Sequence, residues 1–185
     1  MKHDERKKLL KKRMQLSFSE VTQKSNQIKK TLFSLEIFHA SSSILYYISY
    51  GKEVDTHKMI QESLAVGKNV IVPKVLPNNG TLLLSRLLSW NDLEKGCYGI
   101  LEPTQNSIRQ IDINMVDLIV VPIVGFDLQR NRIGHGKGYY DKLLYKNQHI
   151  PTIGLAFECQ MVNDIDKEDH DIKIDMIITE KRIIT

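Results

Sequence analysis

The sequence predicts an α/β fold: a single-domain, layered structure with a mainly parallel central sheet flanked by helices. Segments typical of strands alternate along the chain with segments typical of helices, as expected for layered α/β proteins. The strand segments are continuously apolar, which indicates strands covered on both faces. The 185 residues contain no internal repeat and no linker, so one domain is predicted over residues 1–185.

Two helices are predicted at the start of the chain. Residues 2–14 are rich in good helix formers and predict a polar helix. Ser17 and Glu20 have the spacing of a capping box, in which a hydroxyl caps the helix and a carboxylate follows three residues later. The second helix should end before Ser41. Its apolar residues recur at helical spacing: Val21, Ile28, Leu32 and Leu35.

The first strand and the third helix follow this helical region. Residues 44–50 (ILYYISY) are β-branched, aromatic or apolar except for one serine, and they predict a buried strand. Asp55 or Thr56 is a suitable cap for a helix that runs to Val66, and Gly67 is suited to end it.

A second group of strands is predicted before a long irregular stretch. Residues 69–72 predict a strand that Pro73 should stop, and residues 82–88 resume strand character after a turn. Residues 89–113 contain scattered glycine and proline and predict irregular structure.

The most hydrophobic stretch is residues 117–124 (DLIVVPIV), which predicts a central parallel strand. A glycine-rich loop follows at 125–138, and a helix is expected from about Gly138 to Tyr145. Residues 152–156 and 176–179 predict two more strands.

Charge and composition exclude several classes of protein. The net charge is +4, yet residues 1–30 alone carry ten basic and three acidic side chains. The longest apolar runs have about five residues, against the ~20 that a membrane helix needs, and no signal peptide is evident. Cys97 and Cys159 fit no zinc or redox spacing, so a cytoplasmic protein is expected. The basic start suggests an anionic partner, and nucleic acid is one alternative.

The densest chemical signal is the segment 125–141. Gly134, Gly136 and Gly138 fall within five residues, between a buried strand and a helix. Glycine lets a phosphate approach backbone N–H groups, and the helix N-terminus adds a positive dipole end. The basic side chains of Arg132 and Lys137 add charge, and Asp141 is suited to hold Mg²⁺ beside phosphates. The spacing is neither that of a Rossmann nor that of a Walker loop. A tight turn with solvated charges is the alternative.

This segment resembles the 5-formyltetrahydrofolate cyclo-ligase family, also called 5,10-methenyltetrahydrofolate synthetases. The matching positions are Pro122, Phe126, Asp127, Arg132, Gly134, Gly136, Gly138, Tyr139, Tyr140 and Asp141. Shorter matches run in order through the rest of the chain: Lys2 and Arg6, Glu53–Thr56, Gly99–Pro103, Asp171 and Asp175–Glu180. The glycine segment is specific to the family, whereas each of the others is weak by itself.

The resemblance implies a fold similar to that of sugar-phosphate isomerases and CoA transferases, and an ATP- and Mg²⁺-dependent cyclisation. The formyl oxygen of 5-formyltetrahydrofolate attacks the γ-phosphorus of ATP and gives an N5-iminium phosphate. N10 then attacks the carbon, and the products are 5,10-methenyltetrahydrofolate, ADP and phosphate. Phosphoryl transfer needs positioning and charge neutralisation more than a side-chain nucleophile, which suits the residues of the glycine segment.

The resemblance also implies residue roles. Residues expected at ATP are Lys2, Arg6, Arg132, Ile133, Gly134, His135, Gly136, Lys137, Gly138, Tyr139 and Tyr140. Those expected at the folate are Ile48, Glu53, Tyr98, His135 and Tyr139, with Glu53 facing the pterin amino group and N3–H. Asp141 and Asp175 are the expected Mg²⁺ ligands. The expected catalytic side chains are Arg132, Lys137 and Tyr139.

Two positions depart from the family pattern. His135 stands where the family often has arginine, and Asn131 replaces a frequent glycine. The interpretation is therefore an enzyme acting on ATP and a folate, without a nucleic-acid or membrane partner. A polyglutamate tail on the folate would attract the N-terminal lysines. A relative acting on another phosphorylated small molecule is the third alternative.

Overall fold

The computed structural model describes residues 2–78, 80–96, 99–166 and 171–185. The helices are α1 (Lys2–Met14), α2 (Phe18–Ser34), α3 (Glu36–Ala40), α4 (His57–Ala65) and α5 (Tyr139–Lys146). The strands are β1 (Ser43–Leu45), β2 (Asn69–Leu76), β3 (Thr81–Leu87), β4 (Leu93–Lys95), β5 (Leu101–Pro103), β6 (Leu118–Pro122), β7 (Gly125–Phe126), β8 (Arg132–Ile133), β9 (Thr152–Leu155), β10 (Met176–Ile178) and β11 (Ile183–Ile184). No helix within the described ranges is long and apolar enough to cross a bilayer.

Seven strands form the central sheet, in the order β11-β10-β9-β6-β1-β2-β3. The five inner strands β10, β9, β6, β1 and β2 pair in parallel, and only the two edge strands are antiparallel. The strand predicted at 117–124 is β6, which occupies the middle of the sheet. The prediction of a mainly parallel central sheet is therefore confirmed.

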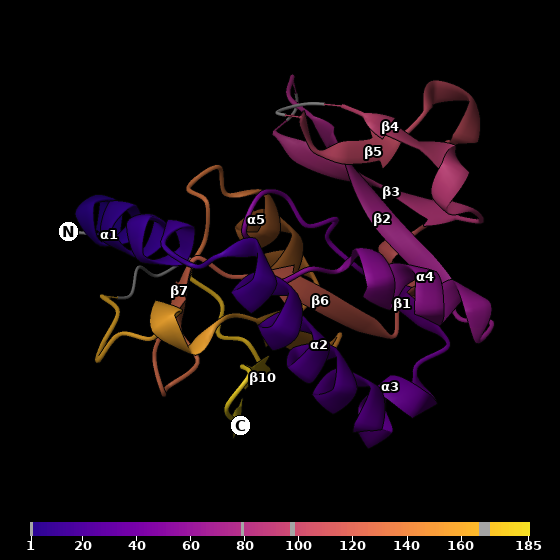
Figure 1. Ribbon diagram of the computed structural model, residues 1–185. Coiled ribbons are helices and arrows are strands. Elements are labelled where there is room, and N and C mark those ends of the chain that lie inside the picture. The colour runs from indigo at the N-terminus through magenta and orange to yellow at the C-terminus, as the bar shows by residue number, and fades with distance from the viewer. Residues whose placement is uncertain (1, 79, 97–98, 167–170) are drawn as a thin grey trace.

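Helices cover both faces of this sheet, as its apolar strands require. Successive side chains of a strand point to opposite faces, and Val120 of β6 packs with Ile28 and Leu32 of α2. The neighbouring Ile119 packs in a separate cluster with Leu144 of α5. Figure 1 shows α2 and α3 on one side of the sheet and α5 on the other. The layered α/β architecture is thus present.

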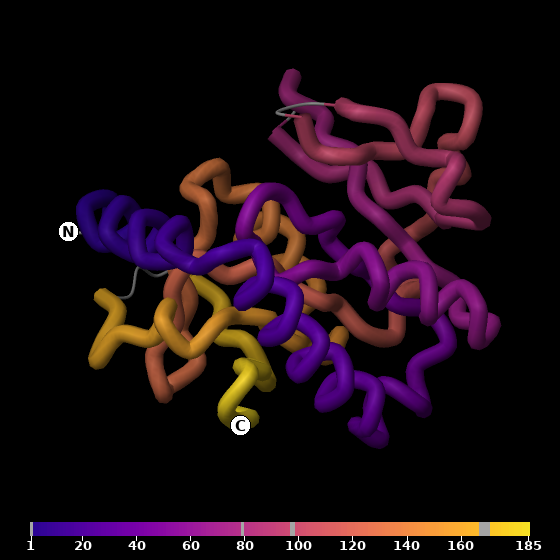
Figure 2. The backbone as a smooth tube through the Cα atoms, viewed as in Figure 1, coloured from indigo at the N-terminus to yellow at the C-terminus, as the bar shows by residue number. Residues whose placement is uncertain are grey.

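Helix α1 lies apart from the other helices. Its one buried apolar residue, Leu9, packs with Val124, Ile133 and Ile165 in a small separate cluster. Figure 2 shows this N-terminal segment running beside much later parts of the chain. The helix that carries the excess positive charge is therefore docked near the β7–β8 hairpin, which holds the start of the glycine segment.

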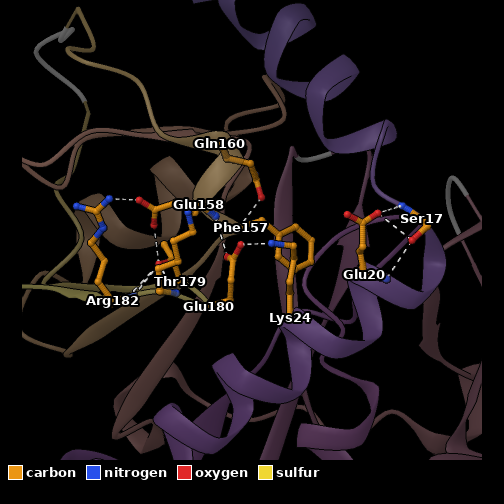
Figure 3. A network of polar contacts seen from close by, with 10 residues as sticks. Ser17, Glu20, Lys24, Phe157, Glu158, Gln160, Thr179, Glu180 and Arg182 are labelled. Atoms are coloured by element: carbon orange, nitrogen blue, oxygen red, sulfur yellow. Dashed lines mark hydrogen bonds and ion pairs between the residues drawn. The ribbon is translucent and has the colours of Figure 1, made fainter.

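The capping box predicted for α2 is present: Glu20 N donates to Ser17 Oγ at 3.1 Å, and Ser17 N donates to Glu20 Oε2 at 2.7 Å. The same helix is joined to the end of the chain through Lys24, which pairs with Glu180 (Figure 3). Glu180 Oε2 also accepts from Glu158 N at 2.9 Å. This network fixes the C-terminal segment against α2.

Four local predictions need correction. The strand predicted at 44–50 ends at Leu45: Tyr46 N still donates to Ile71 O at 2.9 Å, and beyond Tyr46 the side chain of Thr56 binds the backbone. Its hydroxyl donates to Tyr47 O at 2.7 Å and accepts from Ser49 N at 3.0 Å. The hydroxyl of Thr56 is thereby unavailable as a helix cap, and Asp55 Oδ1 accepts from His57 N at 2.9 Å instead.

The other three corrections concern the stretch from Pro73 to residue 113 and the second predicted helix. Strand β2 continues through Pro73 to Leu76. Strand β1 ends opposite Ile71, so β1 offers no partner that an N–H at Pro73 would have to bind, and proline is tolerated there. The region predicted as irregular contains the β4–β5 hairpin, with Glu94 paired to Glu102. The second predicted helix breaks at Leu35, whose extended backbone separates α2 from α3.

Candidate active site

The glycine segment forms the connection between β6 and α5. Gly136 and Gly138 have φ values of +86° and +71°, which side chains with a Cβ rarely adopt. Arg6 of α1 closes over this loop, and its Nε donates to Gly134 O at 2.8 Å. A Cβ added at Gly136 would lie 3.0 Å from Arg6 Cζ. The absence of a side chain at Gly136 thus lets the guanidinium of Arg6 lie against the loop.

Two adjoining pockets lie on either side of this loop. The larger, of about 380 Å³, lies beyond the carboxyl ends of β1 and β6, where ligands of open α/β sheets bind. The smaller, of about 200 Å³, lies between the loop and α1. Both pockets are lined by Arg132, Gly134, Gly136, Gly138 and Asp141, which form their common wall.

An ion pair stands in this common wall. Arg132 Nη2 donates to Asp141 Oδ1 at 2.6 Å, and the Arg132 side chain is only 4% exposed. The Asp141 side chain is 28% exposed. A guanidinium carries five N–H donors, and the ion pair with Asp141 uses one of them, so Arg132 is suited to bind an anion from either pocket.

Glu53 forms the opposite side of the larger pocket. It is 8% exposed, and Tyr50 N donates to its Oε2 at 2.9 Å. Its Oε1 lies 2.7 Å from His135 Nε2 and 3.9 Å from Arg13 Nη1. The His135 contact joins the glycine loop to this carboxylate across the pocket.

Two buried phenols lie beside Glu53. Burial and then the charge of Glu53 raise the pKa values of Tyr47 and Tyr140, against the opposing charges of Arg13 and Arg132 respectively. Tyr47 donates its hydroxyl to Val54 O at 3.0 Å. Both phenols therefore stay protonated around neutral pH.

The structure brings most of the predicted residues to these two pockets. Residues expected at the folate that line the larger pocket are Ile48, Glu53, His135 and Tyr139. Those expected at ATP divide between the pockets: Lys2, Arg6 and Ile133 line the smaller, and Lys137 and Tyr140 line the larger. Tyr98, also expected at the folate, lies outside the described residues.

Asp175 is not brought to this site. It precedes β10, and its Oδ2 accepts from Thr152 N and Oγ1 at 2.9 and 2.8 Å. Since β9 and β10 are parallel to β6, Asp175 lies at the amino edge of the sheet, opposite to the edge that carries Asp141. The two carboxylates that were predicted to share one Mg²⁺ are therefore apart.

Three polar residues in or beside the pockets were given no role by the sequence analysis, although two of them lie at positions that match the family. Asp171 lines the smaller pocket and pairs with Lys2. Glu102 of β5 lines the larger pocket and is 3% exposed. Arg13 is buried beside Glu53, four residues after buried Leu9. That spacing was the one available signal, because positions four apart share a helix face.

The carboxylates of the smaller pocket fit a magnesium site of the kind completed by phosphates. Asp141 and Asp171 both line it, together with basic Lys2 and Arg6. Mg²⁺ in phosphoryl-transfer enzymes is bound by one or two carboxylates and by substrate phosphates. Within the described ranges, no three His, Cys, Asp or Glu side chains are grouped to hold a metal by themselves.

Comparison with known proteins bears on the nature of this site. The model of the 5-formyltetrahydrofolate cyclo-ligase family matches residues 1–180. The 5-formyltetrahydrofolate cyclo-ligase of Haemophilus influenzae is 32% identical over 137 residues, which are 72% of this chain and 73% of the relative. The enzyme of the same name from Mus musculus is 29% identical over 175 residues, with 89% and 86% covered.

Solved structures agree with the sequence relatives. The 5,10-methenyltetrahydrofolate synthetase of Aquifex aeolicus superposes with a TM-score of 0.87 at 36% identity, covering 98% of this chain and 91% of that one. The synthetase of Mycoplasma pneumoniae gives a TM-score of 0.78 at 25% identity, with 97% and 98% covered. Similarity of fold thus extends over nearly the whole of each chain.

Proposed function

Because this chain belongs to the 5-formyltetrahydrofolate cyclo-ligase family of ligases, we propose that it closes 5-formyltetrahydrofolate to 5,10-methenyltetrahydrofolate with ATP and Mg²⁺. The observation that carries this proposal is the pair of adjoining pockets with Arg132 and Asp141 in their common wall. A reaction between two substrates needs both held together, with the charge of the transferred group neutralised between them.

The smaller pocket is the proposed phosphate site. Lys2 and Arg6 supply positive charge from α1, and the glycine backbone allows close approach of phosphate oxygens. This arrangement supports a role for the basic first helix in binding a small anion, in place of the nucleic acid that its charge also suggested. Mg²⁺ held by Asp141 and Asp171 would neutralise phosphate charge there.

The larger pocket is the proposed folate site. Its lining is mainly apolar, and Glu53 is a buried carboxylate acceptor. Adjacent N–H donors of a pterin, the 2-amino group and N3–H, match the two oxygens of a carboxylate. Binding would require Glu53 Oε1 to exchange its contact with His135 for one with the ligand.

The proposed reaction proceeds in two steps. The formyl oxygen attacks the γ-phosphorus, the bond from phosphorus to the bridging oxygen breaks, and ADP leaves. N10 then attacks the iminium carbon and loses its proton, and the carbon–oxygen bond breaks to release phosphate. Arg132 and Lys137 stabilise the negative charge of the phosphoryl group, and Tyr139 contacts both ligands from the loop.

The direct test is the absorbance of methenyl-folate after the protein is mixed with 5-formyltetrahydrofolate, Mg²⁺ and ATP. Product should appear with all components present and disappear when ATP is omitted. Absence of product from the complete mixture would refute the proposal. The role of a polyglutamate tail is tested by comparing folates that carry one glutamate with folates that carry several. Removal of the charges of exposed Lys7, Lys8 and Lys11 should weaken the binding of the long-tailed folate only.

A further inference from the structure

Two buried hydrogen-bond donors in the larger pocket have no acceptor. Four side-chain atoms in the described ranges are buried without a hydrogen-bond partner: Arg13 Nε, Arg130 Nε, Arg132 Nε and Tyr140 Oη. Of these four, the atoms of Arg132 and Tyr140 belong to residues that line this pocket. Proteins satisfy the large majority of their buried polar atoms, so two unsatisfied donors on residues of one cavity wall need an explanation.

Both donors are held in place by their surroundings. Arg132 is anchored through Nη2 to Asp141 at 2.6 Å, which fixes the plane of its guanidinium. The ring of Tyr140 packs against both apolar clusters of the sheet, so its hydroxyl is carried on a fixed ring. Burial raises the pKa of this hydroxyl, and the positive charge of Arg132 acts in the opposite direction.

Other buried tyrosines of this fold do satisfy their hydroxyl groups. Tyr46, fully buried at 0% exposure, has its Oη 3.0 Å from Ser63 Oγ. Tyr47 donates to Val54 O at 3.0 Å. The unsatisfied hydroxyl of Tyr140 is thus a local feature of the pocket wall and not a general property of phenols in this core.

The pair is suited to an oxygen anion at the boundary between the pockets. Arg132 lines both pockets, whereas Tyr140 lines only the larger one. A charged donor and a neutral donor together suit an anionic oxygen better than they suit a neutral acceptor. An anion bound by both donors therefore lies on the folate side of the wall, past the phosphate pocket.

We propose that Tyr140 Oη–H and Arg132 Nε–H bind the phosphoryl group once it has been transferred to the formyl oxygen. This inference rests on the proposed function. When N10 attacks the iminium carbon, the electrons of the carbon–oxygen bond pass to the departing phosphate, and N10 releases its proton. The two donors stabilise the charge that grows on the phosphate oxygens in that step. Tyr140 is then a catalytic residue for the intermediate, and its hydroxyl contributes nothing to the binding of ATP.

Tyr140→Phe tests this role, because it removes one hydroxyl and keeps the packed ring. In the ligand-free protein the hydroxyl has no partner to lose, so the unfolding temperature should stay unchanged or rise by about 2–4 °C. Loss of one donor to a developing anion should lower kcat by about 10²-fold. The KM for ATP should stay within about twofold, since only a transition-state contact is lost.

Tyr46→Phe is the matched control, since Tyr46 lies outside the pocket and its hydroxyl is paired. It should lower the unfolding temperature by about 2–4 °C and leave kcat unchanged. The inference is overturned if Tyr140→Phe keeps wild-type kcat, if its KM for ATP rises in proportion to the loss, or if it is destabilised like Tyr46→Phe. If the wild type itself forms no methenyl-folate with ATP, the proposed function fails first, and this inference fails with it.

Discussion

Replacing Glu53 with glutamine should damage the protein in two separable ways. The Glu53 side chain is 9% exposed, and its Oε1 lies 3.9 Å from Nη1 of Arg13, whose side chain is 8% exposed. The same oxygen is 2.7 Å from His135 Nε2. The substitution keeps the shape of the side chain but removes the only charge that balances buried Arg13 within 4.0 Å among the described residues.

The magnitudes follow from this geometry. At an effective dielectric constant of about 20, unit charges 3.9 Å apart attract by about 4 kcal/mol. Removal of one partner of a buried pair generally costs about 3–5 kcal/mol, since the other charge is left buried. We expect the free energy of unfolding to fall by about 3–4 kcal/mol. Loss of charged hydrogen bonds to the pterin, worth about 1.5–3 kcal/mol, should raise the KM for the folate by about 10–100-fold.

The double variant Arg13→Met/Glu53→Gln separates the two effects. Denaturant unfolding should show it to be more stable than Glu53→Gln alone, because no unpaired charge remains buried. Its KM for the folate should stay as high as that of Glu53→Gln, while the KM for ATP stays near wild type in both. The Arg13–Glu53 coupling would be refuted if the double variant lost as much stability as the Arg13→Met and Glu53→Gln single variants lose together. An unchanged KM for the folate in Glu53→Gln would refute the pterin contact.

The remaining predictions concern the loop, the metal site and the C-terminal network. Asp141→Asn should reduce turnover by about 10²-fold and raise the Mg²⁺ concentration needed for half-maximal rate; activity within a few-fold of wild type would show that Asp141 is not a ligand. Gly136→Ala forces a Cβ onto φ +86° and against the Arg6 guanidinium, so the KM for ATP should rise. Gly67→Ala is the control, because Gly67 has φ +81° and open space around it, so this substitution introduces backbone strain without a clash. If Gly67→Ala raised the KM for ATP as much as Gly136→Ala, the clash with Arg6 would not explain the effect. At Glu180 burial opposes ionisation, but the Lys24 ammonium and the Glu158 amide outweigh it and lower the carboxyl pKa below its usual 4.5. Because the folded pKa is the lower one, this stabilisation is present above pH 4.5 and lost as pH falls; acid unfolding of Glu180→Gln should be less steep than that of wild type, and identical acid profiles would contradict this reading.

Much of the fold could be predicted because its signals are local. The capping box of Ser17 and Glu20 lies within four residues, and the apolar run of β6 identifies the middle of the sheet. The failures came where another segment changes the outcome. The hydroxyl of Thr56 binds the backbone after Leu45 and ends β1 early, and the pairing of β1 decides where Pro73 is tolerated.

The position of the glycine segment at the pockets could likewise be predicted, because its glycines and basic residues are contiguous in the sequence. The long-range partners could not. Arg13 is one of ten basic residues in the first thirty, and only its position four residues after Leu9 distinguishes it from the exposed lysines. It is buried only because α1 docks beside the glycine loop, where Leu9 packs with Ile133. Asp171 and Asp175 lie four residues apart in the sequence, and the path of the folded chain brings Asp171 to the smaller pocket and leaves Asp175 away from it.

The sequence by itself determined the α/β class, because strand and helix patterns are local, and the family, because its motif is carried by contiguous residues of the glycine segment. The tertiary structure decided which side chains meet there. It divided the predicted ATP contacts between two pockets, separated Asp175 from Asp141, and left a donor of Arg132 and the hydroxyl of Tyr140 unsatisfied on residues that line the larger pocket. Burial and charge pairing depend on residues that lie far apart in the sequence, so no local pattern records them.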